Sequence, residues 1–125
     1  MASHLGIELV EAGDDYLKGR LRVDERTSAP GGMLHGGATL ALAETLASWA
    51  ATACIDDSKK MITGVESNAN HLRGAATGFV TGVAKPLHLG RSSQVWEVRV
   101  SDSQDRLVSV ARLTFAVVDL PGKAA

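Results

Sequence analysis

The sequence predicts an α+β protein in which a single curved antiparallel sheet wraps one long helix. Residues 36–54 are almost all small or apolar and include one charged residue, Glu44, which indicates a long buried helix. Strand-like segments precede this run, and three or four consecutive ones follow it. One sheet packed on one helix satisfies this order of elements. Such a sheet leaves one face and its edges uncovered, so we expect oligomerisation, most simply a two-fold dimer.

At 125 residues the chain predicts one compact domain, 1–125, with frayed ends at 1–5 and 120–125. The formal net charge of −1 gives no strong field, so neither nucleic acid nor an anionic membrane is indicated as a partner. Cys54 is the only cysteine, which excludes an internal disulfide and favours a reducing, cytoplasmic setting. Residues 1–15 lack the basic start and apolar segment of a signal peptide.

The strands are predicted from alternation and from turn residues. Residues 6–12 form a short candidate strand, and residues 16–23 alternate apolar and basic side chains as a half-buried antiparallel strand does. Residues 24–32 are a polar loop that leads into the helix. Further strands are expected at 61–72, 78–85, 93–100 and 107–118, with turns at 56–60 and 101–105.

Three details qualify these strands. Asn68 and Asn70 are poor strand formers and indicate an irregular or functional end to their strand. Gly78 and Gly82 allow a bend or a close approach of the backbone. Pro86 limits its strand to a sheet edge or ends the ladder there, because proline cannot donate a backbone hydrogen bond.

The helix at 36–54 is about long enough to cross a bilayer, so a membrane span is an alternative. Its many Ala, Thr, Ser and Gly residues insert weakly, and a central Glu44 opposes insertion by about 3 kcal/mol. We therefore expect a core helix. An unpaired carboxylate inside a core is costly, so Glu44 needs either a function or a partner. A purely structural ion pair with His35, His71 or Arg73 would be the simplest partner.

Candidate chemistry begins at the start of this helix, at His35, Gly36 and Gly37. The first N–H groups of a helix have no intrahelical acceptor, so they form a site for a negative oxygen unless the glycines are only a flexible cap. Glu44 follows His35 by nine residues, and Ser48 lies one turn further on the same face. The N–H donors at the helix start and the Glu44 carboxylate could contact one substrate whose reacting group lies between them. Alternatively, a two-fold dimer could bring Glu44 of one subunit to Gly36 of the other.

A third feature is the absence of Asp and Glu from residue 67 to residue 96, a stretch that is rich in cations. It predicts a local positive field in a chain without a global one. Residues 85–93 combine cations, hydroxyls and a glycine, which suits phosphate oxygens, although a solvated basic loop explains them equally well. The histidines and Cys54 show no metal-ligand spacing, and no nucleophile-elbow GxSxG motif occurs.

These segments resemble those of a known family. Hotdog-fold acyl-CoA thioesterases carry a G-x-L-H-G-G…L-A-E signature, which residues 32–44 resemble with GMLHGGATLALAE. The similarity continues through GVESNANHLR at 64–73, KPLHLG at 85–90 and QVW at 94–96, and it covers roughly residues 15–118. The branch is the glutamate-dependent one, with 4-hydroxybenzoyl-CoA and 1,4-dihydroxy-2-naphthoyl-CoA thioesterases. It is related to the phenylacetate-pathway thioesterases, which use Asp.

The resemblance implies hydrolysis of an aroyl- or medium-chain acyl-CoA, with Glu44 as nucleophile or general base. The Gly36 N–H would stabilise the oxyanion, His35 would order that loop, and Ser48 would help to place the acyl group or water. Coenzyme A, part of the substrate rather than a cofactor, would be held by Asn70, His71, Arg73, Leu87, His88, Leu89, Gly90, Arg91 and Ser92. The active sites would be shared in a homodimer, and two dimers would form a tetramer.

One position departs from the family pattern. The relatives carry Gln or Asn six residues before the motif histidine, where this chain has Ala29, unless the loop shifts Thr27 or Ser28 into the role. Losing one such donor typically costs about 10²–10³ in rate. An acyl-CoA-binding protein with weak or no hydrolysis is therefore the second interpretation. A hotdog dehydratase is a third, but its Asp/His motif is absent from the sequence.

Overall fold

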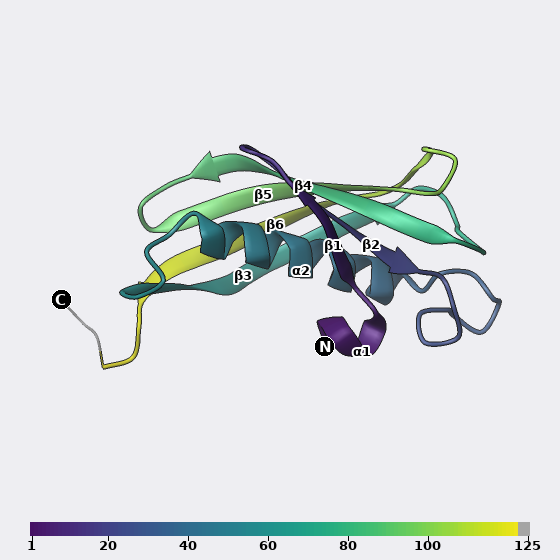
Figure 1. Ribbon diagram of the computed structural model, residues 1–125, viewed down its shortest axis with the longest axis horizontal. Helices are drawn as coiled ribbons and strands as arrows, with labels where there is room; N and C mark the ends of the chain where they lie inside the picture. Colours follow the sequence, from purple (N-terminus) through teal and green to yellow (C-terminus); the bar gives the residue numbers. More distant parts are fainter. Residues whose placement is uncertain (123–125) are drawn as a thin grey trace.

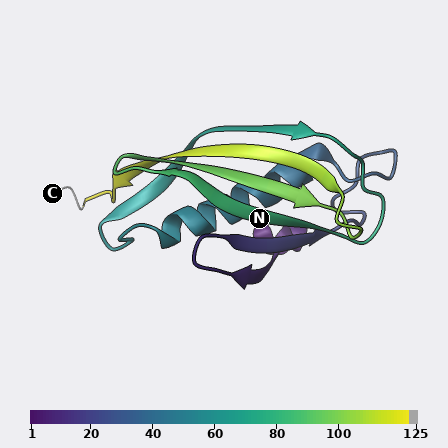
Figure 2. The same cartoon turned by 90° about the horizontal axis from the view of Figure 1, so that it is seen from above.

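The computed structural model describes residues 1–122. The helices are α1 (Ala2–Leu5) and α2 (Gly36–Ala53), and the strands are β1 (Glu8–Ala12), β2 (Leu17–Arg22), β3 (Lys60–His71), β4 (Phe79–Leu89), β5 (Ser93–Ser101) and β6 (Leu107–Asp119). All six strands form one antiparallel sheet in the order β1-β2-β4-β5-β6-β3. Figure 1 shows α2 lying along this sheet, and Figure 2 shows the strands side by side over the helix. The predicted α+β architecture is confirmed, and it is the hotdog fold.

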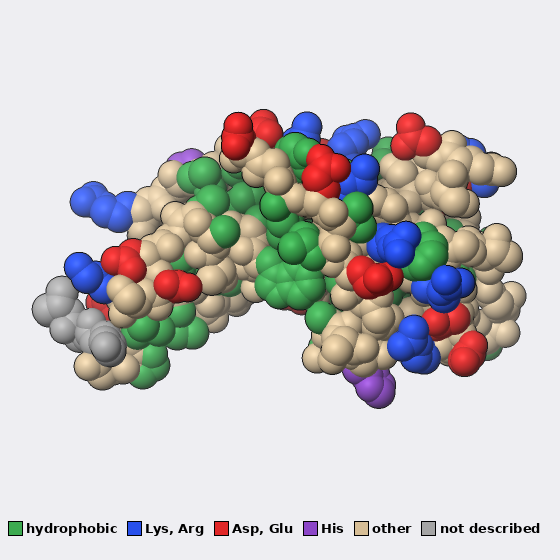
Figure 3. All heavy atoms as spheres, in the orientation of Figure 1, with side chains coloured by type: hydrophobic (Ala, Val, Ile, Leu, Met, Phe, Trp, Pro, Cys, Tyr) green, Lys and Arg blue, Asp and Glu red, His purple; other side chains and the backbone are tan. Residues whose placement is uncertain are grey.

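The helix α2 is buried on one face only. Eight residues make up that face: Ala38, Thr39, Leu42, Ala43, Leu46, Ala47, Ala50 and Ala51. The opposite face carries Glu44 and Trp49, both exposed. Figure 3 shows hydrophobic side chains gathered over the middle of the molecule, where α2 runs in Figure 1. The expectation of a helix buried on all sides is therefore wrong for the single chain, because one sheet covers only one side of a helix.

A pair of glycines lets α2 approach the sheet closely. Gly19 of β2 and Gly82 of β4 are register partners, and the side chain of Leu46 lies over both. A Cβ atom added at Gly19 would lie 2.4 Å from Leu46 Cδ2, and one added at Gly82 would lie 2.9 Å from Leu46 Cδ1. The close approach predicted at Gly82 is therefore confirmed, and Gly19 shares the role.

We expect Gly19→Ala to lower the free energy of unfolding by about 1–3 kcal/mol, because the methyl group overpacks against Leu46. It would also lie 2.9 Å from the backbone oxygen of Glu8, which cannot rotate away. Urea unfolding followed by tryptophan fluorescence measures the change. Gly31→Ala is the matched control, because a Cβ at Gly31 meets nothing within 4 Å. Equal midpoints for the two variants would show that the glycine pair is not needed for packing.

Two strand details differ from the expectation. β4 does not stop at Lys85 but continues to Leu89, since its pairing with β5 persists beyond Pro86 with an irregularity before His88. The ladder between β4 and β2 does end at Ala84, so Pro86 sits where no β2 residue needs its missing N–H. In β3 the predicted irregularity at Asn68 and Asn70 is absent, because both pair with β6 in register. The irregularity lies instead between Gly64 and Glu66.

The N-terminus is ordered rather than frayed. Residues 2–5 form α1, which ends at Gly6 in the left-handed conformation with φ 78°. Ala2 and Leu5 pack against the core, and the Arg26 side chain donates to the backbone oxygen of His4 at 3.2 Å. At the other end, Leu120 donates to the backbone oxygen of Lys59 at 3.0 Å, and residues 123–125 lie outside the described residues.

Candidate active site

The start of α2 presents a single uncommitted N–H group. His35 is the N-cap, with an extended backbone, and its Nδ1 accepts from the Gly37 N–H at 2.8 Å. The His35 backbone oxygen accepts from the N–H groups of Ala38 and Thr39 at 3.0 and 3.2 Å. The Gly36 N–H makes no hydrogen bond within residues 1–122. Of the donors expected here, the histidine therefore occupies one and leaves Gly36 free for a ligand.

Glu44 lies on the open face of α2, in the middle of the helix. It makes no hydrogen bond or ion pair with any residue that the structure describes, so the structural pairing with His35, His71 or Arg73 does not form. A Cβ added at Gly64 of β3 would lie 3.5 Å from Glu44 Oε1, in ordinary contact, so the carboxylate lies beside this strand. A carboxylate with no partner among residues 1–122 is available for chemistry.

Glu44 borders a cavity of about 430 Å³ that is lined by residues from α1, α2, β3 and β6. Thr45, Ser48 and Thr63 supply hydroxyls, and Trp49, Ile62 and Phe115 supply apolar surface. Ser48 thus lies beside Glu44 as the helical spacing predicts. Sequence reasoning missed Trp49, Ile62 and Thr63. Trp49 could have been found, because it is a large residue directly after Ser48 in a helix of small ones. Nothing in the sequence of β3 indicated that Ile62 and Thr63 line the cavity.

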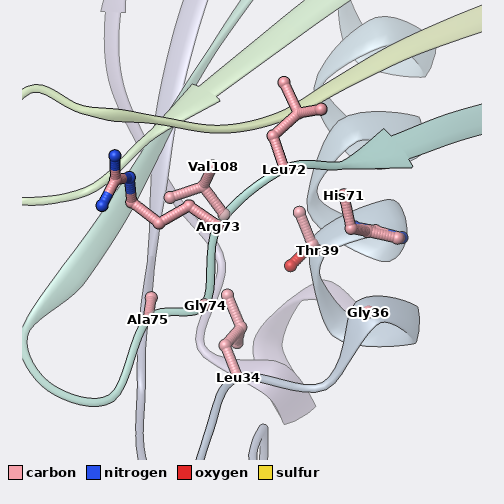
Figure 4. A pocket seen from close by; sticks show the side chains of 9 residues that line it. All are labelled: Leu34, Gly36, Thr39, His71, Leu72, Arg73, Gly74, Ala75 and Val108. Atoms are coloured by element: carbon pink, nitrogen blue, oxygen red, sulfur yellow. The ribbon is translucent and has the colours of Figure 1, made fainter.

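A second cavity, of about 440 Å³, lies at the start of α2. It is lined by Leu34, Gly36, Thr39, His71, Leu72, Arg73, Gly74, Ala75 and Val108, which Figure 4 shows as sticks. Gly36 and Glu44 are eight residues apart and border different cavities. Along an α-helix this separation is about 12 Å. One chain therefore does not bring the free N–H and the free carboxylate together.

The two basic segments also lie apart. Residues 71–73 line the cavity at the start of α2, whereas Leu89 and Pro86 line a cavity of about 460 Å³ with Ala53 and Cys54 at the end of that helix. An 18-residue helix spans about 27 Å. The single local positive field expected from residue 67 to residue 96 is therefore divided between the two ends of α2.

The loop that contains Ala29 is closed by its own hydrogen bonds. The buried Thr27 hydroxyl donates to the Arg22 backbone oxygen at 2.9 Å, and the Ser28 hydroxyl donates to the Asp24 backbone oxygen at 2.7 Å. Neither hydroxyl is free to take the role that Ala29 cannot fill, so the suggested shift of Thr27 or Ser28 does not occur.

An ion pair anchors the same loop. The Arg26 side chain donates to Asp24 Oδ2 at 2.9 Å, and this hydrogen bond is the main cause that holds the pKa of the Asp24 carboxyl below its usual value. Because the folded-state pKa is lowered, the stabilisation is present above the ordinary carboxyl pKa. It is lost as the pH falls through the lowered value.

Within residues 1–122, no three His, Cys, Asp or Glu side chains are grouped so that they could hold a metal ion. No helix in that part of the chain is long and apolar enough to cross a membrane.

Comparison with known proteins identifies the family. The Thioesterase superfamily profile matches residues 31–109. An esterase of Pseudomonas aeruginosa is 48% identical over 120 residues, which cover 96% of this chain and 83% of the relative. The 1,4-dihydroxy-2-naphthoyl-CoA hydrolase of Escherichia coli is 45% identical over 118 residues, which cover 94% of this chain and 86% of the relative.

Solved structures of related proteins indicate the same family. A crystal structure of a Pseudomonas aeruginosa thioesterase variant, with one Gln replaced by Ala, has a TM-score of 0.94 and 47% identity over 95% of this chain and 86% of that one. A Staphylococcus aureus protein was solved as two variants, one with a Glu and one with a Gln replaced by Ala, at TM-scores of 0.92 and 0.91 and 33% identity. These two cover 95% and 94% of this chain, and 98% and 97% of the solved ones. This chain therefore belongs to the thioesterase superfamily and is a hydrolase with the hotdog fold of its thioesterase relatives.

Proposed function

We propose that the chain hydrolyses an acyl-CoA thioester to the free acid and CoA, with Glu44 as the catalytic carboxylate. The observation that carries this proposal is the exposed Glu44, which has no partner among the described residues and lies beside a cavity of about 430 Å³. As a general base, Glu44 removes a proton from water while the water oxygen attacks the thioester carbonyl. As a nucleophile, its own oxygen attacks and forms an anhydride, which water then cleaves. In both routes the C–S bond breaks, and the CoA sulfur leaves as a thiolate that is then protonated.

The tetrahedral intermediate needs a donor for its negative oxygen, and the Gly36 N–H is free to supply it. Because Gly36 lies about 12 Å along the helix from Glu44, we assign the donor to the partner subunit of a two-fold dimer. His35 then serves as the cap that takes the Gly37 N–H and leaves the Gly36 N–H unshared.

The terminal strand β3 is the surface that suits this dimer. Nearly all of its residues are exposed, including Val65 at 64%, and among the described residues only β6 pairs with it. A long, unprotected edge strand recruits another strand. The Gly64 region of β3 lies beside Glu44, and its His71 end lies beside Gly36. Two copies of β3 paired antiparallel near their middle would therefore bring Glu44 to Gly36 of the partner subunit.

The same two-fold pairing would join the divided basic segments. It sets the start of one α2 against the far part of the other, so residues 70–73 of one subunit approach residues 87–92 of its partner. We propose that Asn70 and Arg73 hold coenzyme A together with Leu87, His88, Leu89, Gly90, Arg91 and Ser92. Two such dimers would make the tetramer that the resemblance implies.

Arg91→Ala is expected to raise KM for an acyl-CoA and leave KM for the truncated acyl-pantetheine thioester unchanged, because the truncated substrate lacks the nucleotide phosphates. Steady-state hydrolysis of both substrates measures the difference. Lys18→Ala, which removes a cation from β2, is the control and should change neither value. Equal effects of Arg91→Ala on both substrates would mean that Arg91 does not contact the phosphates.

For the acyl group we propose an aroyl moiety or a medium chain. Trp49, Ile62 and Phe115 offer apolar surface beside Glu44, and the hydroxyls of Thr45, Ser48 and Thr63 can bind polar substituents. The name of the Escherichia coli relative supports an aroyl-CoA. Thiol release over a panel of aroyl- and acyl-CoAs tests the whole proposal, and no turnover with any of them would refute it.

Ala29 favours a second candidate, an acyl-CoA-binding protein with weak hydrolysis. In the Staphylococcus aureus protein the two positions changed to Ala are fifteen residues apart, as are Ala29 and Glu44 here. The equal spacing supports the proposal that Ala29 occupies the position of that Gln. Tight binding of acyl-CoAs by calorimetry, without thiol release across the panel, would favour the binding protein.

A further inference from the structure

The proposed oxyanion site is short of one donor. Ala29 has no polar side chain, and the hydroxyls of Thr27 and Ser28 are bound to backbone oxygens of their own loop. Gly36 would then be the only donor to the thioester oxygen. Because one such donor contributes about 10²–10³ in rate, another group near the Gly36 N–H would matter for the reaction.

The His71 side chain lies beside Gly36, the first residue of α2. A Cβ added at Gly36 would be 3.1 Å from His71 Nε2, and 3.4 Å from Cδ2 and Cε1, so the ring stands against the first residue of α2 with Nε2 foremost. Figure 4 shows the His71 ring turned toward α2, whereas the Arg73 side chain points in the opposite direction. His71 therefore does not extend the cationic surface to which Arg73 belongs.

The separation of the two nitrogens suits a shared acceptor. An added Cβ is about 2.5 Å from the nitrogen of its own residue by covalent geometry. With the 3.1 Å above, Gly36 N and His71 Nε2 are at most about 5.6 Å apart. One oxygen at the usual N···O distance of about 2.9 Å can accept from two nitrogens at this separation.

We infer that His71 Nε2–H is the second donor to the thioester oxygen and takes the place of the amide that is missing at Ala29. This inference rests on the proposed function, and it assigns His71 to the reacting carbonyl rather than to coenzyme A. Gly36 contributes twice: its N–H binds the oxygen, and its missing side chain lets the imidazole approach.

A buried hydroxyl without a hydrogen bond among the described residues lies on the strand that pairs with the His71 end of β3. Ser109 of β6 is fully buried, its Oγ has no hydrogen-bond partner among the described residues, and it pairs with His71 in the β3–β6 register. Directly opposite residues of an antiparallel pair share one face of the sheet. Ser109 Oγ does not reach His71 in this structure; a side-chain rotation that let it donate to His71 Nδ1 would keep the proton on Nε2.

The test is a double-mutant cycle of wild type, His71→Ala, Ala29→Gln and the double variant, assayed with an acyl-CoA and with its truncated pantetheine thioester. His71→Ala should lower kcat by about tenfold to a hundredfold with both substrates, because the lost hydrogen bond is to the reacting carbonyl. Ala29→Gln should restore most of that loss in the His71→Ala background, yet change wild type little. His71→Gln, which keeps a donor, should retain more activity than His71→Ala.

Three results would overturn the inference: an unchanged kcat in His71→Ala, a loss confined to KM for the full acyl-CoA, or an equal gain from Ala29→Gln in both backgrounds. Thermal unfolding of each variant shows whether the fold is kept. His4→Ala is the matched control, because His4 is exposed and lines neither the cavity at Gly36 nor the cavity at Glu44.

A second readout does not depend on turnover. A ketone analogue, in which a methylene separates the sulfur from the carbonyl, binds without being hydrolysed. Its carbonyl stretch should shift to lower frequency on wild type and shift less on His71→Ala, and equal shifts would refute the inference. If instead the proposed function is wrong, the wild-type protein hydrolyses none of the thioesters in the panel, or Glu44→Gln leaves its hydrolysis unchanged.

Discussion

Glu44→Gln is expected to lower kcat by about 100-fold or more with any good acyl-CoA substrate, because an amide is neither a base nor a nucleophile. The substitution preserves size and shape. Glu44 is exposed and makes no hydrogen bond or ion pair with described residues, so the fold loses nothing. Thiol release gives kcat, and thermal unfolding should give an unchanged midpoint.

Glu66→Gln is the matched control. Glu66 follows the irregularity in β3 and lines a small cavity together with Glu44, but both of its carboxylate oxygens accept from Asn68 Nδ2, at 3.1 and 3.0 Å. A carboxylate that is already hydrogen-bonded in its own chain is a poorer candidate for the catalytic base. Near-normal turnover in Glu44→Gln, or a comparable loss in Glu66→Gln, would refute the assignment of Glu44.

A mixture of two inactive variants is expected to recover activity if each site uses Glu44 of one subunit and Gly36 of the other. Gly36→Pro removes the N–H with little cost to the helix, because Gly36 is the first helical residue and His35 before it is already extended. We expect this variant alone to lose at least about 10²–10³ in kcat, because it removes the N–H and also sets a Cβ 3.1 Å from His71 Nε2. Coexpressed in equal amounts with Glu44→Gln, it should give about a quarter of wild-type activity, since half of the two-fold dimers are mixed and each has one intact site.

The reciprocal mixture separates the two arrangements. A chain with both substitutions, coexpressed with wild type, should also give about a quarter of wild-type activity if the sites are shared, and about a half if each subunit is complete. No recovery in the first mixture, together with a half in the second, would show that Glu44 and Gly36 act within one chain. Native mass spectrometry of each mixture verifies that mixed dimers form.

The layers of the fold were predictable, since they follow from local patterns. Small residues over 36–54 and alternation over 17–22 are enough for a helix and a strand, and the turns at 56–60 and 101–105 separate the rest. The errors occur where a neighbour overrides local preference. β4 continues past Pro86 because β5 pairs with it there, and α1 forms because Ala2 and Leu5 find core to cover. Neither neighbour is visible in the local sequence.

For the candidate site, the sequence located residues but not distances. The motif from Gly32 to Glu44 singled out both ends of the proposed chemistry, and its role stays a prediction until the variants are measured. A burial argument first singled out Glu44, and in the single chain that argument was wrong, because the open face of α2 has no cover there.

The sequence by itself determined the class of elements, the family signature and the departure at Ala29, because side-chain periodicity and motif spacing are properties of neighbouring residues. Only the tertiary structure decided three further matters. It set Gly36 and Glu44 in separate cavities, divided the basic residues between the two ends of α2, and placed His71 against Gly36. The reason is physical: these relations depend on how β3 packs against α2, and contacts between residues distant in sequence are set by the packed sheet and helix.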